Sequence, residues 1–219
     1  MYRSWWKILA ASLVIYATVA GFLMPVPRMA ILNETIRNLY FHVPMWFAMI
    51  VLFSISVWYS VRFLASGKES DDLRAVESAN TGIIFGLLGL VTGALWAGYT
   101  WGEFWSFDPK QNFAAIAVLL YFAYFVLRNA VDEEQKRGKI SAIYNIFAFP
   151  MMVVLLFVLP RLQDSLHPGN GGNPGFNSYD LDSRMRLVFY PACLGWILVG
   201  YWVYSICFRL RSLENKDIH

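Results

Sequence analysis

Charged residues are scarce in this sequence of 219 residues. They make up 15% of it, whereas soluble domains usually carry about 25%, and 58% of the residues are hydrophobic. The mean hydropathy is +0.45. This composition excludes an ordinary soluble domain and indicates an integral membrane protein. The formal net charge of +3 leaves no basic surface of the kind that nucleic acids require.

Cysteine is also scarce, and the motifs that would give it a role are missing. Cys193 and Cys207 lie 14 residues apart in one apolar run, which in a helix is about 21 Å and too far for a disulfide. We expect both to be buried as small apolar residues. The sequence has no Cys-x-x-Cys or zinc-ligand spacing, and it has no P-loop motif for binding ATP.

Six apolar runs dominate what is present. A membrane-spanning helix needs about 20 apolar residues, and only the fourth run is short, because its 15 residues would cover about 22 Å. We predict an all-α integral membrane protein, a single domain over residues 1–219, with an interfacial Trp-rich segment before the fourth helix. The expected transmembrane helices are residues 5–26, 43–64, 81–100, 113–127, 142–159 and 187–208.

The first apolar run has two interpretations. Arg3 and Lys7, followed by the small residues 18–20, resemble a secretory signal peptide with its cleavage site. Trp5 and Trp6 are instead typical of a membrane interface, and the apolar run continues past that site. These features favour a retained helix.

The distribution of lysine and arginine predicts the orientation. Of the 18 cations, six lie in residues 27–42, 101–112 and 160–186, and the other 12 lie in the remaining segments. The positive-inside rule then places both termini in the cytoplasm and the three cation-poor segments on the outer face, which is periplasmic in a bacterium. The inner connections 66–78 and 128–139 mix acids and bases, and we expect them to be solvated linkers.

Two of the three histidines fall on the predicted outer face. His42 and His167 come from distant parts of the sequence, whereas His219 is the last residue. Neutral imidazole is the commonest metal ligand. Two imidazoles without a cysteine or carboxylate cluster suit a haem iron better than zinc, which takes three or four protein ligands. From the residues alone, bis-histidine haem and two unrelated structural histidines are equally favoured, ahead of other metals and quinones.

A tryptophan-rich segment, residues 96–112, lies between these histidines in the chain. Trp101, Phe104, Trp105 and Asp108 have the spacing of one helical face. This pattern predicts either an interfacial amphipathic helix anchored by its aromatic residues or a wall for a flat aromatic ligand. Because a proline follows Asp108, we expect this residue to cap the fourth helix or to orient a neighbouring group.

The two propionates of a haem would need nearby cations. Arg37 is the best candidate because it precedes His42 by five residues. Lys110, Arg184 and Arg186 are weaker candidates. Each of these cations could equally be an ordinary interfacial side chain.

The motif Trp101-Gly102-x-x-Trp105-x-Phe107-Asp108 resembles the WWD signature, Trp-Gly-x-x-Trp-x-Trp-Asp, of haem-handling proteins in cytochrome c biogenesis. Together with the flanking histidines and six helices, it makes the chain similar to the CcmC (haem exporter protein C) family, which is related to CcsA and CcmF. Phe107 replaces a signature tryptophan and lacks its indole N–H. The sequence that follows, Asp108-Pro109-Lys110, is closer to CcsA-type proteins.

The resemblance implies a protein of the bacterial inner membrane that binds haem b at its periplasmic side and passes it to the haem chaperone CcmE. It also implies the CcmA/CcmB transporter and the small subunit CcmD as partners, and no catalysis. His42 and His167 would be the axial ligands, and Arg37 would pair with a propionate. The remaining haem-binding residues implied are Trp96, Trp101, Gly102, Phe104, Trp105, Phe107 and Asp108.

Three alternatives differ from this function. A CcsA-like synthase subunit would attach haem to apocytochrome thiols, and a large outer domain or additional helices would favour it. A transmembrane electron carrier would need redox centres at both faces, but only the terminal histidine is near the inner one. An assembly scaffold would use its aromatic residues only as anchors and would carry no pigment.

Overall fold

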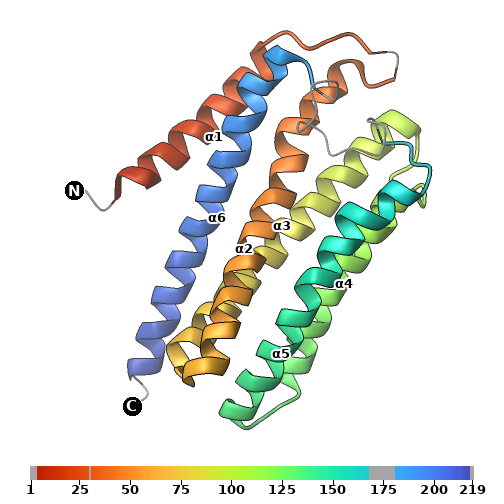
Figure 1. The fold of residues 1–219 in the computed structure, drawn as a ribbon. Coiled ribbons are helices and arrows are strands. Elements are labelled where there is room, and N and C mark those ends of the chain that lie inside the picture. Colours follow the sequence, from red (N-terminus) through yellow and green to blue (C-terminus); the bar gives the residue numbers. More distant parts are fainter. Residues whose placement is uncertain (1–3, 30, 168–180, 218–219) are drawn as a thin grey trace.

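The computed structural model describes residues 4–29, 31–167 and 181–217, and this part of the chain is all-helical (Figure 1). Six of its helices are long and apolar enough to cross a membrane, which confirms the predicted number of candidate spans. The main helices are α1 (Trp5–Leu23), α2 (Leu39–Ser66), α3 (Glu69–Trp101), α4 (Pro109–Asn129), α5 (Glu134–Val153) and α6 (Ser183–Asp217).

Three short helical segments flank the longer ones. The 3-10 helix η2 (Asn33–Asn38) leads directly into α2. At the end of α5, on the same side of the bundle as η2, the chain forms a wide π turn, η3 (Val154–Val158), and a final 3-10 turn, η4 (Leu159–Leu162). Helix α5 and these two turns form one candidate span of 29 residues.

Helix α2 is the centre of the bundle and packs against α3, α5 and α6 (Figure 1). Helix α1 packs mainly on α6, and α4 fills the space beside α3 and α5. The connections α1–α2 and α3–α4, together with the end of η4, lie at one end of the molecule, at the top of Figure 1. We call this the outer end, because the cation distribution predicts it to be outside.

The predicted helix boundaries need correction at the polar connections. Helix α4 has 21 residues, so the fourth span is not short. Helices α3 and α5 begin at Glu69 and Glu134, so most residues of the expected linkers 66–78 and 128–139 are helical. Charged residues of these stretches are paired, since Arg128 forms a bidentate ion pair with Asp72, in which Nη1 and Oδ1 are 2.9 Å apart. Asp71 is also buried, with Arg62 3.4 Å away.

The core holds α2, α3 and α4 together through a stacked aromatic pair. Phe53 of α2 and Tyr121 of α4 are parallel, with ring centroids 3.4 Å apart. Gly82 of α3 lies against this stack, because a Cβ atom there would come within 2.6 Å of the Phe53 ring. The absent side chain therefore lets α3 approach α2 closely, as small residues do in membrane helix packing.

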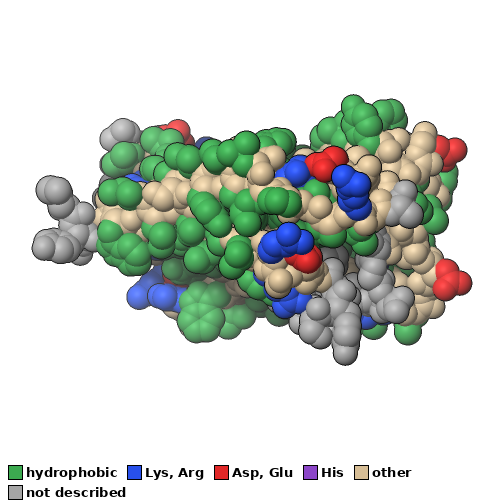
Figure 2. Space-filling view, turned by 90° about the horizontal axis from the view of Figure 1, so that it is seen from above, with side chains coloured by type: hydrophobic (Ala, Val, Ile, Leu, Met, Phe, Trp, Pro, Cys, Tyr) green, Lys and Arg blue, Asp and Glu red, His purple; other side chains and the backbone are tan. Residues whose placement is uncertain are grey.

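Large hydrophobic residues are exposed on all the long helices, as lipid contact requires. In the view from above, hydrophobic side chains cover much of the coloured surface, and Lys, Arg, Asp and Glu form only small groups (Figure 2). Ile84 and Val126, for example, are large hydrophobic residues that are mostly exposed. Cys193 and Cys207 are both free on α6, as predicted, but they are half-buried rather than fully buried.

We predict that Gly82→Ala destabilises the protein. Alanine at an unconstrained helix position would stabilise by about 1 kcal/mol relative to glycine. Here the methyl group would displace the Phe53–Tyr121 stack, and overpacking of this kind costs about 1–3 kcal/mol. The expected result is a lower midpoint of thermal unfolding in detergent. Ile84→Ala, a lipid-facing change two residues away, should have a smaller effect, and a raised midpoint for Gly82→Ala would contradict the packing described.

Candidate functional site

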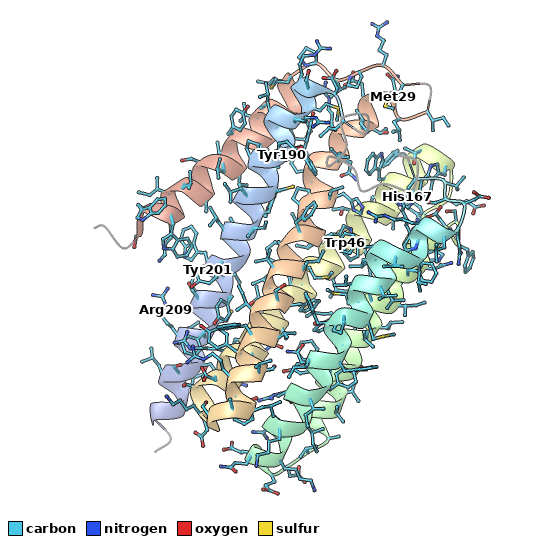
Figure 3. All side chains as sticks on the ribbon, viewed as in Figure 1. Met29, Trp46, His167, Tyr190, Tyr201 and Arg209 are labelled. Carbon is cyan, nitrogen blue, oxygen red and sulfur yellow. The ribbon has the colours of Figure 1, made fainter. Side chains whose placement is uncertain are left out.

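A cavity opens at the outer end between α2, α3, the start of α4 and the end of α5. Its empty volume is about 1120 Å³, part of which is open to the surroundings. Figure 3 shows Trp46 and His167, two of its lining residues, on either side of the space between α2 and α5. Most of the wall is apolar, and its histidine, tryptophan and polar residues are His42, Trp46, Trp96, Trp105, Lys110, Gln111 and His167.

His42 lies in the first turns of α2 and is held by residues of α3. A Cβ atom on Gly93 would come within 2.7 Å of the ring's Cε1, so the ring lies directly on the glycine backbone. Trp46 and Trp96 meet the imidazole edge-on, with centroids 6.2 and 6.0 Å away. The Nδ1 atom is 3.2 Å from Oγ1 of Thr92. The position of the ring is therefore fixed on several sides.

His167 lies beyond the end of η4 and is held by the segment that joins α3 to α4. Its Nδ1 is 2.8 Å from Oδ1 of Asp108, and the Trp101 ring packs edge-on against it with centroids 4.9 Å apart. Ser165 donates a hydrogen bond to Oδ2 of the same carboxylate at 2.9 Å. Thus the two outer connections meet at this histidine. Residues 169–175, which follow this histidine and are rich in glycine and asparagine, lie outside the described residues.

Asp108 has both roles predicted for it. Its Oδ1 accepts the backbone N–H of Lys110 at 2.9 Å and caps α4, and its Oδ2 accepts the N–H of Leu166 at 2.7 Å. Burial alone would raise the pKa of this carboxyl, but hydrogen bonds and charge from His167, with the bonds from Leu166 and Ser165, hold the pKa well below its ordinary value. The group is therefore an ionised carboxylate that only accepts hydrogen bonds.

The helical face predicted for Trp101, Phe104, Trp105 and Asp108 is wrong. Helix α3 ends at Trp101 because Gly102 adopts φ +84°, and α4 begins only after Asp108. The segment between them is irregular, and its hydrogen bonds come from the first turn of α4. Gln111, for example, accepts the backbone N–H of Ser106 at 3.0 Å.

The irregular path separates the aromatic residues of the motif. Trp105 lines the cavity, and Trp101 contacts His167. Phe104 folds back on Gly98 of α3, where a Cβ atom would be 2.7 Å from its ring, and its side chain is exposed. Phe107 has a left-handed backbone, φ +57°, is 76% exposed and does not line the cavity.

The structure does not bring Arg37 to the cavity. Its Nη1 donates to the carbonyl groups of Gly21 and Met24, both at 2.7 Å, and its Nε pairs with Glu34 at 2.8 Å. It therefore ties the end of α1 to η2. Of the other predicted cations, Lys110 lines the cavity, whereas Arg184 and Arg186 lie at the start of α6 and do not.

Several residues that shape the site are not singled out by sequence reasoning. Trp46 follows His42 by four residues, and this helical spacing predicts that it lies beside the histidine. Gly89 and Gly93 have the small-xxx-small spacing of close helix packing, and they receive the rings of Trp46 and His42. Thr92 gives no such signal, because hydroxyl residues are common in membrane helices.

Comparisons with known proteins point to one family. A sequence profile described as Heme exporter protein C matches residues 1–217. Heme exporter protein C of Rhodobacter capsulatus is 23% identical over 97% of this chain and 90% of its own length. Heme exporter protein C of Paracoccus denitrificans is 25% identical over 73% of this chain, and the match covers only 66% of the length of that relative. Cytochrome c biogenesis protein CcsA of Prochlorococcus marinus is 44% identical, but over only 30% of this chain and 22% of its own.

We predict that Asp108→Ala loosens both outer connections together. The change removes a helix cap, worth about 1 kcal/mol, and leaves the Leu166 N–H without its acceptor. In hydrogen–deuterium exchange, peptides from 104–112 and 160–167 should exchange about tenfold faster or more, since 1.4 kcal/mol is a factor of ten.

Asp182→Ala is the matched control for this change. Asp182 accepts the backbone N–H of Arg184 at 2.9 Å at the start of α6, but it has no histidine partner in the described part of the chain. This variant should speed exchange only near residue 184. Faster exchange confined to 104–112 in Asp108→Ala would show that the carboxylate does not hold the second connection.

Proposed function

The chain belongs to the Heme exporter protein C (CcmC) family, whose members take part in cytochrome c biogenesis, and on this basis we propose that it holds haem in the outer-end cavity and passes it to a haem chaperone. In this function the protein is a carrier rather than an enzyme. Haem is its cargo, bound in the periplasmic half of a bacterial inner membrane.

The observation that carries the proposal is that His42 and His167 line one cavity. They come from α2 and from the connection after η4, far apart in the chain, and each is held in place by its own neighbours. Two unrelated structural histidines would have no reason to face a common empty space. Bis-histidine ligation of an iron needs imidazoles that approach from two sides of such a space.

The walls of the cavity suit a porphyrin. Trp96, whose ring contacts His42, and Trp105 supply aromatic surface to the cavity, and the rest of the wall is mainly aliphatic and aromatic. Binding sites of this kind are apolar with a few placed polar groups. Along α2 the lining extends from Leu39 to Ile50, which is about 16 Å of helix. The ring would therefore lie within the outer half of the membrane rather than on its surface.

We assign the propionate contact to Lys110. It lies at the first turn of α4, lines the cavity and carries a charge that an ionised propionate can pair with. Arg37, the stronger candidate by sequence, has its guanidinium bonded to two carbonyl groups and to Glu34. Its role is then to fix the connection that precedes His42.

Transfer of the haem follows from where the two ligands lie. His42 is part of a membrane helix, whereas His167 belongs to a connection at the outer end. A chaperone approaching from outside, such as CcmE, would displace one histidine from the iron and withdraw the haem. Energy for the delivery would come from the CcmA/CcmB transporter, with CcmD as the accompanying small subunit, because this sequence has no P-loop.

The ligand assignment predicts the absorption spectrum of the purified protein. Wild-type protein should show the Soret and α bands of six-coordinate haem. His42→Ala and His167→Ala should each lose one axial ligand, shift these bands and retain less haem, while His219→Ala should match wild type. If both cavity variants keep the wild-type bands, these histidines are not the ligands, and a wild-type protein without pigment would favour an assembly scaffold.

The position of Phe107 predicts that it has little part in haem binding. Its ring is exposed and outside the cavity, so Phe107→Trp should leave the haem spectrum and content unchanged even though it restores the family signature. Trp105→Leu, which removes an aromatic wall, should lower haem content at equal protein yield. A spectral change in Phe107→Trp that equals that of Trp105→Leu would show that residue 107 reaches the haem.

A further inference from the structure

The two proposed ligands are held through the same ring nitrogen. Nδ1 of His42 is 3.2 Å from the Thr92 hydroxyl, and Nδ1 of His167 is 2.8 Å from the Asp108 carboxylate. The ligand rings come from different parts of the chain, and so do their partners. Which nitrogen of a histidine binds a metal is set by the hydrogen bond that the other nitrogen makes.

The proton in the first pair can be placed from the neighbours of Thr92. Its hydroxyl oxygen is 2.7 Å from the Leu88 carbonyl, which can only accept, so the hydroxyl proton points there. The oxygen is then an acceptor for His42 Nδ1–H. The Gly89 carbonyl, 3.2 Å from the same oxygen, can likewise only accept, so the hydroxyl proton points to a carbonyl in either case.

In the second pair the partner is a carboxylate. Asp108 accepts from Lys110, Leu166 and Ser165, as an ionised group does. Nδ1 of His167 can therefore approach it only as a donor. Both rings then carry a proton on Nδ1.

We propose that Thr92 and Asp108 are positioning residues, which hold the Nδ1–H groups of His42 and His167 and so leave the Nε2 lone pair of each ring for the haem iron. This inference rests on the proposed function. Partners of this kind fix the tautomer and orientation of a ligand histidine, and their loss typically weakens metal affinity about 10–100-fold.

The two partners differ in strength, so the two ligands are unequal. A hydrogen bond to a carboxylate is stronger than one to a neutral hydroxyl, and the contact of His167 is also the shorter, at 2.8 Å against 3.2 Å for His42. The carboxylate also makes its imidazole a more basic ligand. His167 would therefore be the stronger electron donor to a bound iron, and Asp108 would favour the oxidised haem more than Thr92 would.

The tautomers can be tested without haem. The chain has only three histidines, so protein labelled with ¹⁵N-histidine in lipid nanodiscs gives three ring systems. The spectra should be recorded at a pH high enough that the ¹⁵N chemical shifts of the rings no longer change with pH. Under this condition two rings should show a protonated Nδ1 and an unprotonated Nε2. Thr92→Val should remove this signature from His42 alone, and Asp108→Ala from His167 alone. Thr92→Ser, which keeps the hydroxyl, should restore it.

Matched controls separate positioning from general structural effects. Thr100 donates to the Trp96 carbonyl at 2.8 Å, as Thr92 does to Leu88, and Asp182 caps α6 as Asp108 caps α4. Thr100→Val and Asp182→Ala should bind haem as wild type does. Thr92→Val and Asp108→Ala should bind it about 10–100-fold more weakly. Asp108→Asn, which keeps a capping acceptor but loses the charge, should retain six-coordinate haem with a more positive reduction potential.

The outcomes distinguish this inference from the proposed function. Rings protonated at Nε2 in wild-type protein, or wild-type affinity in both Thr92→Val and Asp108→Ala, would overturn the positioning roles and leave the ligands assigned. An unchanged potential in Asp108→Asn would overturn the inequality of the ligands. If neither His42→Ala nor His167→Ala changes the haem spectrum, the proposed function fails, and this inference fails with it whatever the tautomers are.

Discussion

The arrangement of the outer end depends on one buried carboxylate. Asp108 accepts hydrogen bonds from Lys110 at the start of α4 and from Leu166, Ser165 and His167 in the connection after η4. A buried carboxylate is costly unless it is paired and fully hydrogen-bonded. Because the carboxylate needs all of these donors, it holds the start of α4 and the connection after η4 together. This contact also places His167 at the cavity.

The opposite wall of the site depends on the missing side chains of glycines in α3, in addition to the polar contact between His42 and Thr92. Gly89 and Gly93 leave room for Trp46 and His42, and Gly82 does the same for Phe53 closer to the inner end. One face of α3 thus receives rings from α2 over several turns. A single close helix pair provides both the stable centre of the bundle and one of the two proposed iron ligands.

The sequence predicts the six spans because each is an apolar run of about membrane length. The distribution of lysine and arginine also predicts that His42 and His167 lie at the same end. It does not predict the path of the tryptophan segment, because the spacing of Trp101, Phe104 and Trp105 fits a helix as well as it fits a loop. Gly102 and Asp108 decide the matter, since they end one helix and begin the next. The placement of Arg37 depends on carbonyl groups of α1 that no local pattern reveals.

The π turn in α5 sets the direction in which the chain enters the outer connection. A turn of this type is equivalent to one residue inserted in an α-helix, and π turns frequently occur at functional sites. One residue corresponds to about 100° of rotation in an α-helix. Leu156 and Phe157 of this turn and Pro160 just beyond it line the cavity. In a regular α-helix the residues after Val158 would be rotated by about 100° about the helix axis. The segment that carries Leu166 and His167 to Asp108 would then start from a different side of α5.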